Sequence, residues 1–164
     1  MKFIIRLFSA LIITFSYIEL AYSKTTKIII FGDSLIAGYG LVVEDNFVNQ
    51  LKLKTIENKI NDVTLFNSGV SGETSTGLLN RYKWVLEDNY DGVIILIGAN
   101  DALRGIDPSL TSQNIEKILI YLKEKQIPTM LIGMKAPNNL GEIYVNEFNA
   151  IYPRLSKKYS IAFY

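Results

Sequence analysis

Short apolar runs alternate with longer amphipathic stretches along the chain after residue 23. The short runs are rich in Ile, Val and Phe, and they predict strands at residues 27–31, 63–66, 92–97, 129–132 and 160–164. The runs are continuously apolar rather than alternating, which is typical of parallel strands that are buried on both faces.

Between these runs, apolar residues recur at the spacing of one helix face. This pattern predicts helices over residues 45–58, 74–86, 112–125 and 143–158. Strict alternation of strand and helix predicts right-handed crossovers and a doubly wound α/β sheet. No linker or internal repeat interrupts the pattern, so we expect one domain over residues 24–164.

The first 23 residues have a different character from the rest. Lys2 and Arg6 precede an apolar run over residues 7–18, and the small residues Ala21 and Ser23 follow it. This order is typical of a secretory signal peptide. A retained membrane anchor is the alternative, but the run is shorter than the roughly 20 residues that span a bilayer. We therefore expect cleavage and export to the periplasm or the medium, with no stable membrane span afterwards.

The composition excludes several classes of protein. The chain has 17 Lys and Arg against 16 Asp and Glu, so no basic excess points to nucleic acid. It contains no cysteine, which excludes a disulfide framework and a thiolate zinc site. It also contains no histidine, which is the usual general base near neutral pH and the commonest metal ligand.

Residues with chemical potential follow three of the expected strands, where a doubly wound sheet binds its ligands. Ser34 follows the first strand and is either a nucleophile beside a base or a plain loop or cap serine. Gly72 precedes a helix start, where backbone N–H groups favour negative charge, or is the lead-in to an ordinary cap. Asn100 offers an amide to the same cleft or simply forms a turn. Their coincidence at three strand ends favours a common site.

Three sequence blocks, GDSLIAGYG, NSGVSGETSTG and GANDALRG, together resemble the first three blocks of the SGNH, or GDSL, hydrolase family. Their spacing is most similar to the branch that holds bacterial periplasmic acyl-CoA thioesterases, lysophospholipases and arylesterases. The resemblance extends over residues 27–164. With the alternating pattern, it implies a flavodoxin-like, three-layer α/β/α fold with a parallel sheet in the order 2-1-3-4-5.

The resemblance also implies roles for individual residues. Ser34 matches the nucleophile, and its own N–H, the N–H of Gly72 and the side chain of Asn100 match the oxyanion donors. Asp33 and Asp101 match flanking acidic positions with supporting roles. The implied reaction is hydrolysis of a small-molecule carboxylic ester or thioester through an acyl-enzyme, without a metal or an organic cofactor.

The family's fourth block, Asp-x-x-His, has no counterpart here. It supplies the general base and the Asp that orients it, and it follows the fifth strand, inside which this sequence ends at Tyr164. We therefore expect a hydrolase domain over 24–164 that is incomplete at its C-terminus, and a chain with little turnover. A non-catalytic module that binds an acyl or carbohydrate ligand is the alternative. A flavodoxin-like nucleotide binder is disfavoured, because no phosphate-cradling glycine motif is present.

The signal-peptide interpretation predicts the N-terminus of the exported protein. Mass spectrometry of that protein is expected to find Lys24 at or near the N-terminus, because the small residues before it suit signal peptidase. An exported chain that still begins at Met1 would contradict the interpretation.

Overall fold

The computed structural model describes residues 24–164, so the expected signal peptide lies outside the described residues. The strands are β1 (Thr26–Gly32), β2 (Val63–Gly69), β3 (Gly92–Leu96), β4 (Thr129–Leu131) and β5 (Ala162–Phe163). All neighbouring strands are parallel, and their order in the sheet is β2-β1-β3-β4-β5. The predicted strands and strand order are confirmed.

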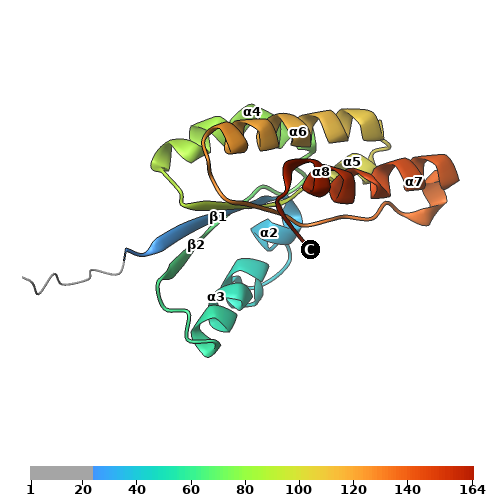
Figure 1. Cartoon of the computed structure of the whole chain (residues 1–164). Coiled ribbons are helices and arrows are strands. Elements are labelled where there is room, and N and C mark those ends of the chain that lie inside the picture. The colour runs from blue at the N-terminus through green and yellow to red at the C-terminus, as the bar shows by residue number, and fades with distance from the viewer. Residues whose placement is uncertain (1–23) are drawn as a thin grey trace, which may run out of the picture.

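Helices cover both faces of this sheet. They are α2 (Ser34–Ala37), α3 (Phe47–Glu57), α4 (Ser75–Val85), α5 (Ala99–Leu103), α6 (Pro108–Glu124), α7 (Glu142–Asn149) and α8 (Ile151–Tyr159), with 3-10 turns at Val43–Asp45, Leu86–Asp88 and Asn138–Leu140. α4, α6 and α8 pack on one face and α2 and α3 on the other (Figure 1), which confirms the three-layer fold. None of the helices within residues 24–164 is long and apolar enough to cross a membrane.

The helix prediction was wrong in detail at the C-terminal end. One helix over 143–158 was expected, but α7 ends at Asn149 and α8 begins at Ile151. Pro153 explains the break, because a proline has no N–H to donate to the carbonyl of residue 149 and its ring crowds that carbonyl. Its place in the first turn of α8 is one that proline tolerates.

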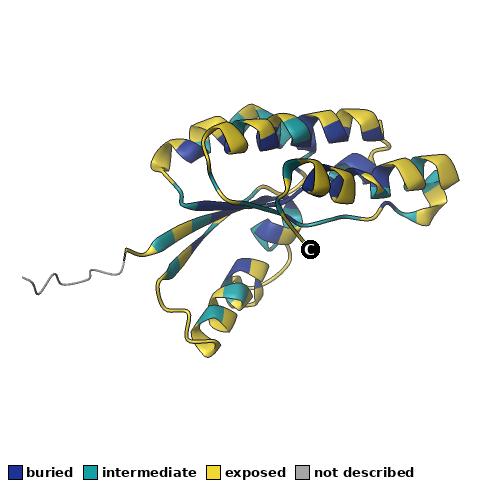
Figure 2. Ribbon diagram, viewed as in Figure 1, coloured by how far each residue is buried: buried dark blue, intermediate teal, exposed yellow. Residues whose placement is uncertain are grey.

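The central strands bury side chains on both faces. Ile29, Phe31 and Ile95 join the larger core cluster beneath α4, α6 and α8, whereas Ile30 and Leu96 join the smaller cluster beneath α2 and α3. Figure 2 shows the resulting buried band along the middle of the sheet. The continuous apolar runs of the sequence therefore reflect burial from two sides, as expected for parallel strands.

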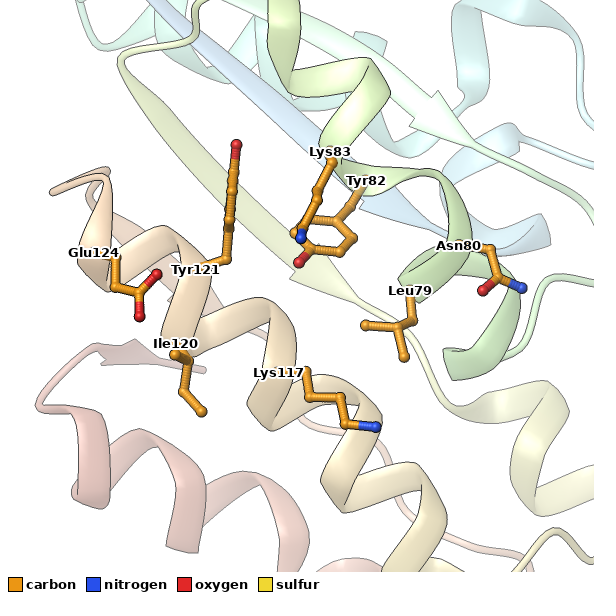
Figure 3. A pocket seen from close by; sticks show the side chains of 8 residues that line it. All are labelled: Leu79, Asn80, Tyr82, Lys83, Lys117, Ile120, Tyr121 and Glu124. Carbon is orange, nitrogen blue, oxygen red and sulfur yellow. The ribbon is translucent and has the colours of Figure 1, made fainter.

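The outer surfaces of α4 and α6 form a groove of about 530 Å³ (Figure 3). Tyr82 and Tyr121 meet edge to face along it, with ring centroids 5.2 Å apart. The Lys83 ammonium lies 5.9 Å and 5.4 Å from those two centroids, so the groove has a charged and solvated rim. None of the candidate catalytic residues from the sequence analysis lines this groove.

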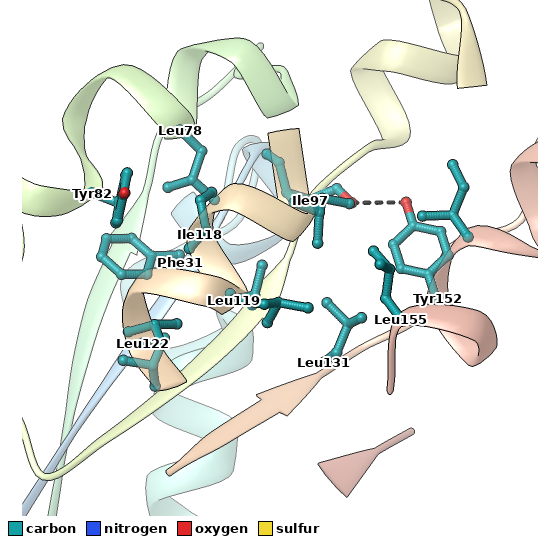
Figure 4. Packing of buried hydrophobic residues seen from close by; sticks show 14 of the residues in the cluster. Phe31, Leu78, Tyr82, Ile97, Ile118, Leu119, Leu122, Leu131, Tyr152 and Leu155 are labelled. Carbon is teal, nitrogen blue, oxygen red and sulfur yellow. Dashed lines mark hydrogen bonds between the residues drawn. The ribbon is translucent and has the colours of Figure 1, made fainter. Parts of the chain in front are cut away.

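Tyr152 ties α8 to the end of β3. Its hydroxyl donates to the Ile97 carbonyl at 2.9 Å, and its ring lies in the core beside that strand end (Figure 4). Gly98 follows with φ of +122°, and a Cβ there would overlap with the Tyr152 hydroxyl. Only glycine therefore suits position 98, both for its backbone conformation and for the close approach of Tyr152.

The substitution Gly98→Ala is expected to destabilise the protein by about 3 kcal/mol or more, because it combines backbone strain with loss of the Tyr152 hydrogen bond. Urea unfolding of the purified protein measures the loss. Gly105→Ala is the control, since Gly105 has φ of +62° but open space around it. That variant is expected to lose only about 1 kcal/mol, and equal losses in the two variants would contradict the role given to Tyr152.

Candidate active site

Three loops leave the same edge of the sheet at the same level. The strand register pairs Gly32 with Gly69 on one side and with Leu96 on the other, and these are the last residues of β1, β2 and β3. Ser34, Gly72 and Asn100 come two, three and four positions after these strand ends. The fold therefore carries all three loops to the carboxyl edge, where sheets of this type bind ligands.

Ser34 is the first residue of α2 rather than part of an open loop. Asp33 caps this short helix, because its Oδ1 accepts the N–H of Leu35 at 3.0 Å. The Ser34 carbonyl accepts the N–H groups of Gly38 and Tyr39 at 3.0 and 3.1 Å. Ser34 is half-buried and Leu35 is exposed, so the serine lies at the surface on a fixed backbone.

Asp33 has an unusual environment for a carboxyl group. It is fully buried, and its Oδ2 has no hydrogen-bond partner among the described residues. Burial raises the pKa of this carboxyl, and the charge of Asp101 raises it further against the lowering effect of the Leu35 N–H. The cost of an unpaired buried oxygen is therefore located one residue before Ser34.

Asp101 is also fully buried, but both of its oxygens are satisfied. Oδ2 accepts the Ser75 N–H at 2.8 Å, and Oδ1 accepts the Ser75 hydroxyl at 2.5 Å and the Thr111 hydroxyl at 3.1 Å. Asn114 donates in turn to Ser75 Oγ at 3.0 Å. This network joins α4, α5 and α6, so Asp101 fixes these three helices relative to one another.

Gly72 lies in the turn between β2 and α4, with φ of +78° and its surface exposed. The adjacent Glu73 side chain is buried and receives two hydrogen bonds from the Arg81 guanidinium, at 2.5 and 2.6 Å. Arg81 also donates to the hydroxyl and the carbonyl of Ser68. This paired contact anchors the turn to α4 and to the end of β2.

Asn100 is the second residue of α5, and its Nδ2 donates to the Glu73 carbonyl at 3.0 Å. An amide carries two N–H groups, and this bond uses one of them. Arg104, at the end of α5, donates to the Gly72 carbonyl at 2.9 Å. The structure thus brings Asn100 and the Gly72 turn into direct contact.

Sequence reasoning missed the residues that hold these loops, namely Glu73, Arg81 and Arg104. The Arg81–Glu73 pair joins residues eight positions apart, and the Arg104–Gly72 contact spans 32 positions. Neither pair follows a helical or strand period that would reveal it before folding. By contrast, the cap of α6 at Asp107 could have been predicted, because Asp followed by Pro is a typical beginning of a helix.

The usual general base of proteins near neutral pH is not available in this sequence. The sequence has no histidine. Tyr152 is buried near the site, but burial, followed by the charges of Asp101 and Asp33, raises the pKa of its hydroxyl, and it already donates to the Ile97 carbonyl. Within residues 24–164, no group of three or more His, Cys, Asp and Glu residues is placed to hold a metal ion.

The fold places the protein in the class of doubly wound α/β sandwiches with a ligand-binding edge at the strand ends. The chain matches the GDSL-like Lipase/Acylhydrolase family over residues 30–164 and belongs to that family. The resemblance to SGNH ester and thioester hydrolases, first recognised in three sequence blocks, is thereby confirmed.

Proteins of named activity are similar in sequence to most of this chain. An arylesterase of Vibrio mimicus is 32% identical over 154 residues, which are 93% of this chain and 76% of that protein. The thioesterase 1/protease 1/lysophospholipase L1 of Escherichia coli K12 is 33% identical over 135 residues, 82% of this chain and 63% of that protein. The crystal structure of AlinE4, an SGNH-hydrolase family esterase, superposes with a TM-score of 0.81 at 40% identity, covering 85% of this chain and 75% of that one. The chain thus spans about two thirds to three quarters of these proteins.

The environment of Asp33 predicts an unusual pH dependence of stability. A raised pKa means that the folded state binds the proton more tightly than the unfolded chain does. The Asp33 contribution to the free energy of unfolding is therefore largest below the ordinary pKa of 3.8 and falls as pH rises through the raised folded value. Asp33→Asn keeps an oxygen for the Leu35 N–H but cannot ionise. The stability of the wild type relative to this variant is expected to fall as pH rises from the ordinary pKa of 3.8 through the raised folded-state pKa.

Asp107→Asn is the matched control, because Asp107 caps α6 through the Ser109 N–H in the same way. Hydrogen bonds from the side chain and backbone of Ser109 lower the pKa of Asp107, so the wild type should gain stability over this variant as pH rises. Chemical unfolding at a series of pH values measures both differences. Slopes of the same sign would contradict the assignment.

Proposed function

We propose that this protein is an exported serine hydrolase of carboxylic esters or thioesters, acting through an acyl-enzyme on Ser34. The observation that carries the proposal is the register of β1, β2 and β3, which sends the loops of Ser34, Gly72 and Asn100 to one edge of the sheet. Membership of the GDSL-like Lipase/Acylhydrolase family supports the same chemistry.

In the proposed reaction, Ser34 Oγ attacks the carbonyl carbon of the substrate and the carbonyl oxygen becomes an oxyanion. The N–H groups of Ser34 and Gly72 and the second N–H of the Asn100 amide stabilise that charge. The C–O or C–S bond to the leaving group then breaks, and the leaving group takes up the proton lost by Ser34 and departs as an alcohol or thiol. Water attacks the acyl-enzyme, the bond to Ser34 Oγ breaks, and the acid is released as Ser34 regains a proton. The bond from Asn100 to the Glu73 carbonyl favours this role, because it holds the amide in place before substrate arrives.

The proton of the Ser34 hydroxyl needs an acceptor for this reaction to be fast. Because the 164 residues contain no histidine, we infer that this polypeptide on its own hydrolyses esters slowly. In serine hydrolases that lose a member of the triad, about 10³–10⁴-fold acceleration over water remains from binding and the oxyanion donors.

The same absence of histidine favours a second candidate, a non-catalytic module that holds an acyl or carbohydrate ligand at this edge. The two candidates differ in what a supplied base does. A hydrolase responds to a correctly placed histidine with turnover that depends on Ser34, whereas a binding module does not.

The test compares the chain with a version extended beyond Tyr164 by the Asp-x-x-His segment of a relative, using a short-chain aryl ester and an acyl thioester. The extended version is expected to gain several orders of magnitude in kcat/KM, because the histidine accepts the Ser34 proton. Ser34→Ala in the extended version should abolish the gain, and Asn100→Ala should reduce it by about 10²–10³.

Asn80→Ala is the control for the asparagine substitution, since Asn80 is exposed on α4 and lines the distant α4–α6 groove. It should leave turnover unchanged. Rapid turnover by the unextended chain that persists in Ser34→Ala would contradict the proposal. An extended version that folds but gains nothing would favour the binding module.

A further inference from the structure

The Arg81 guanidinium joins the two ends of the loop between β2 and α4. At one end it donates to the Ser68 hydroxyl at 2.8 Å and to the Ser68 carbonyl at 2.7 Å. At the other end it donates to the two carboxylate oxygens of Glu73 at 2.5 and 2.6 Å. Ser68 lies within β2, and Glu73 lies two residues before α4. One side chain therefore fixes both points between which the loop of Gly72 runs.

The guanidinium has little freedom to move. Its central carbon lies 5.4 Å from the centre of the Phe31 ring, and Phe31 is fully buried in β1, where it pairs with Ser68 in the sheet register. The Arg81 side chain is only 21% exposed, and that of Glu73 is 5% exposed. A planar guanidinium that lies over a fixed ring and makes several directed hydrogen bonds is a rigid support.

The Glu73 side chain reaches Arg81 by crossing Gly77. A Cβ at position 77 would lie 3.0 Å from Glu73 Cγ, so the side chain passes directly over the glycine. Glycine is unfavourable inside a helix, and the space that it leaves for Glu73 explains why it is present. The contact between Glu73 and Arg81, which are eight positions apart, therefore depends on this close approach.

Glu73 is also the residue that holds the Asn100 amide. Its carbonyl accepts a hydrogen bond from Asn100 Nδ2 at 3.0 Å, and its own N–H bonds the Val70 carbonyl at 3.1 Å. The N–H and the side chain together locate the Cα of Glu73, and with it the carbonyl group. The two N–H bonds of an amide lie in one plane at a fixed angle, so a carbonyl that fixes one of them also restricts the direction of the other.

We propose that Arg81 is a positioning residue for the Asn100 amide and acts through Glu73. It holds the Glu73 carbonyl at the place where the amide directs its second N–H toward an oxyanion. The inference rests on the proposed function, in which Asn100 is an oxyanion donor. Arg81 itself does not touch the reacting atoms in this role. Donors stabilise a transition state best when they are fixed in advance, so an amide whose support moves loses part of its effect.

The main variant replaces the ion pair without leaving a buried charge. Glu73→Met/Arg81→Met exchanges both members for unbranched apolar side chains, a kind of change that is often neutral or stabilising for buried pairs. Ser68 is half-buried, so water can take over the hydrogen bonds that it loses. Glu116→Met/Lys158→Met is the matched control, since that pair joins α6 to α8 with a distance of 2.6 Å.

The first measurement does not depend on activity. ¹⁵N relaxation of side-chain amides in the purified protein should show a rigid Asn100 amide in the wild type and larger picosecond-to-nanosecond motion in Glu73→Met/Arg81→Met. The Asn100 signals are identified by their loss in Asn100→Ala. Arg81→Lys should show an intermediate effect, because an ammonium keeps Glu73 paired but lacks the planar fork that also reaches Ser68. The control pair should leave the Asn100 amide unchanged.

The second measurement is a mutant cycle in the version that carries the Asp-x-x-His segment. Glu73→Met/Arg81→Met should lower kcat by roughly ten-fold with little change in KM, which is less than the loss expected for Asn100→Ala because the donor is displaced rather than removed. In an Asn100→Ala background, the same pair of substitutions should lower kcat hardly any further, since the amide through which Arg81 acts is gone. A pair that only stabilised the fold would have the same effect in both backgrounds.

The outcomes separate the two proposals. An Asn100 amide that stays rigid in both Arg81 variants overturns the positioning role, whatever the activity. So do additive losses in the mutant cycle when turnover of the extended version depends on Ser34. Turnover that is independent of Ser34 overturns the proposed function instead, and the amide relaxation still decides whether Arg81 orients Asn100.

Discussion

The hydrogen bonds to the buried carboxylate of Asp101 are the interaction on which the candidate site depends. A carboxylate without access to water must be satisfied by fixed donors, or it destabilises the fold. Here the donors are the backbone and hydroxyl of Ser75 at the start of α4 and the hydroxyl of Thr111 in α6. Satisfying one side chain therefore fixes the starts of two helices relative to α5. The placement of Asn100 and Arg104, and through them of the turn at Gly72, follows from it.

Asp33, unlike Asp101, is a buried acidic side chain whose hydrogen bonds are incomplete. One of its oxygens caps α2 and the other has no partner among the described residues, although the side chain is fully buried. The charge of Asp101 adds to the cost, since it raises the pKa of Asp33 further. One carboxylate thus organises the site and the other is poorly satisfied beside Ser34. Local violations of the rule that buried polar groups are paired are expected at functional sites rather than in ordinary core positions.

The sequence predicted the sheet well because burial on two faces leaves a direct mark, a continuous apolar run at each strand. It did not predict α2 and α5, since helices of four and five residues are too short to show a hydrophobic period. The break between α7 and α8 had a visible cause in Pro153, which amphipathic periodicity outweighed in the prediction. The contacts of Arg81 and Arg104 correspond to no pattern in the sequence, because each joins loops and helices that meet only in the folded protein.

These differences separate the parts of the proposed site that depend on the fold from those that do not. The nominated oxyanion donors are backbone or amide groups, and their positions follow from strand register, a capped turn and a buried network. None of these supports involves a general base. Stabilisation of an oxyanion is an electrostatic effect of donors fixed in advance, whereas activation of Ser34 requires a proton acceptor at the right distance. In the proposed function the two contributions are therefore physically separable. The described residues are proposed to supply the first. The second needs a proton acceptor, and the sequence contains no histidine to act as one.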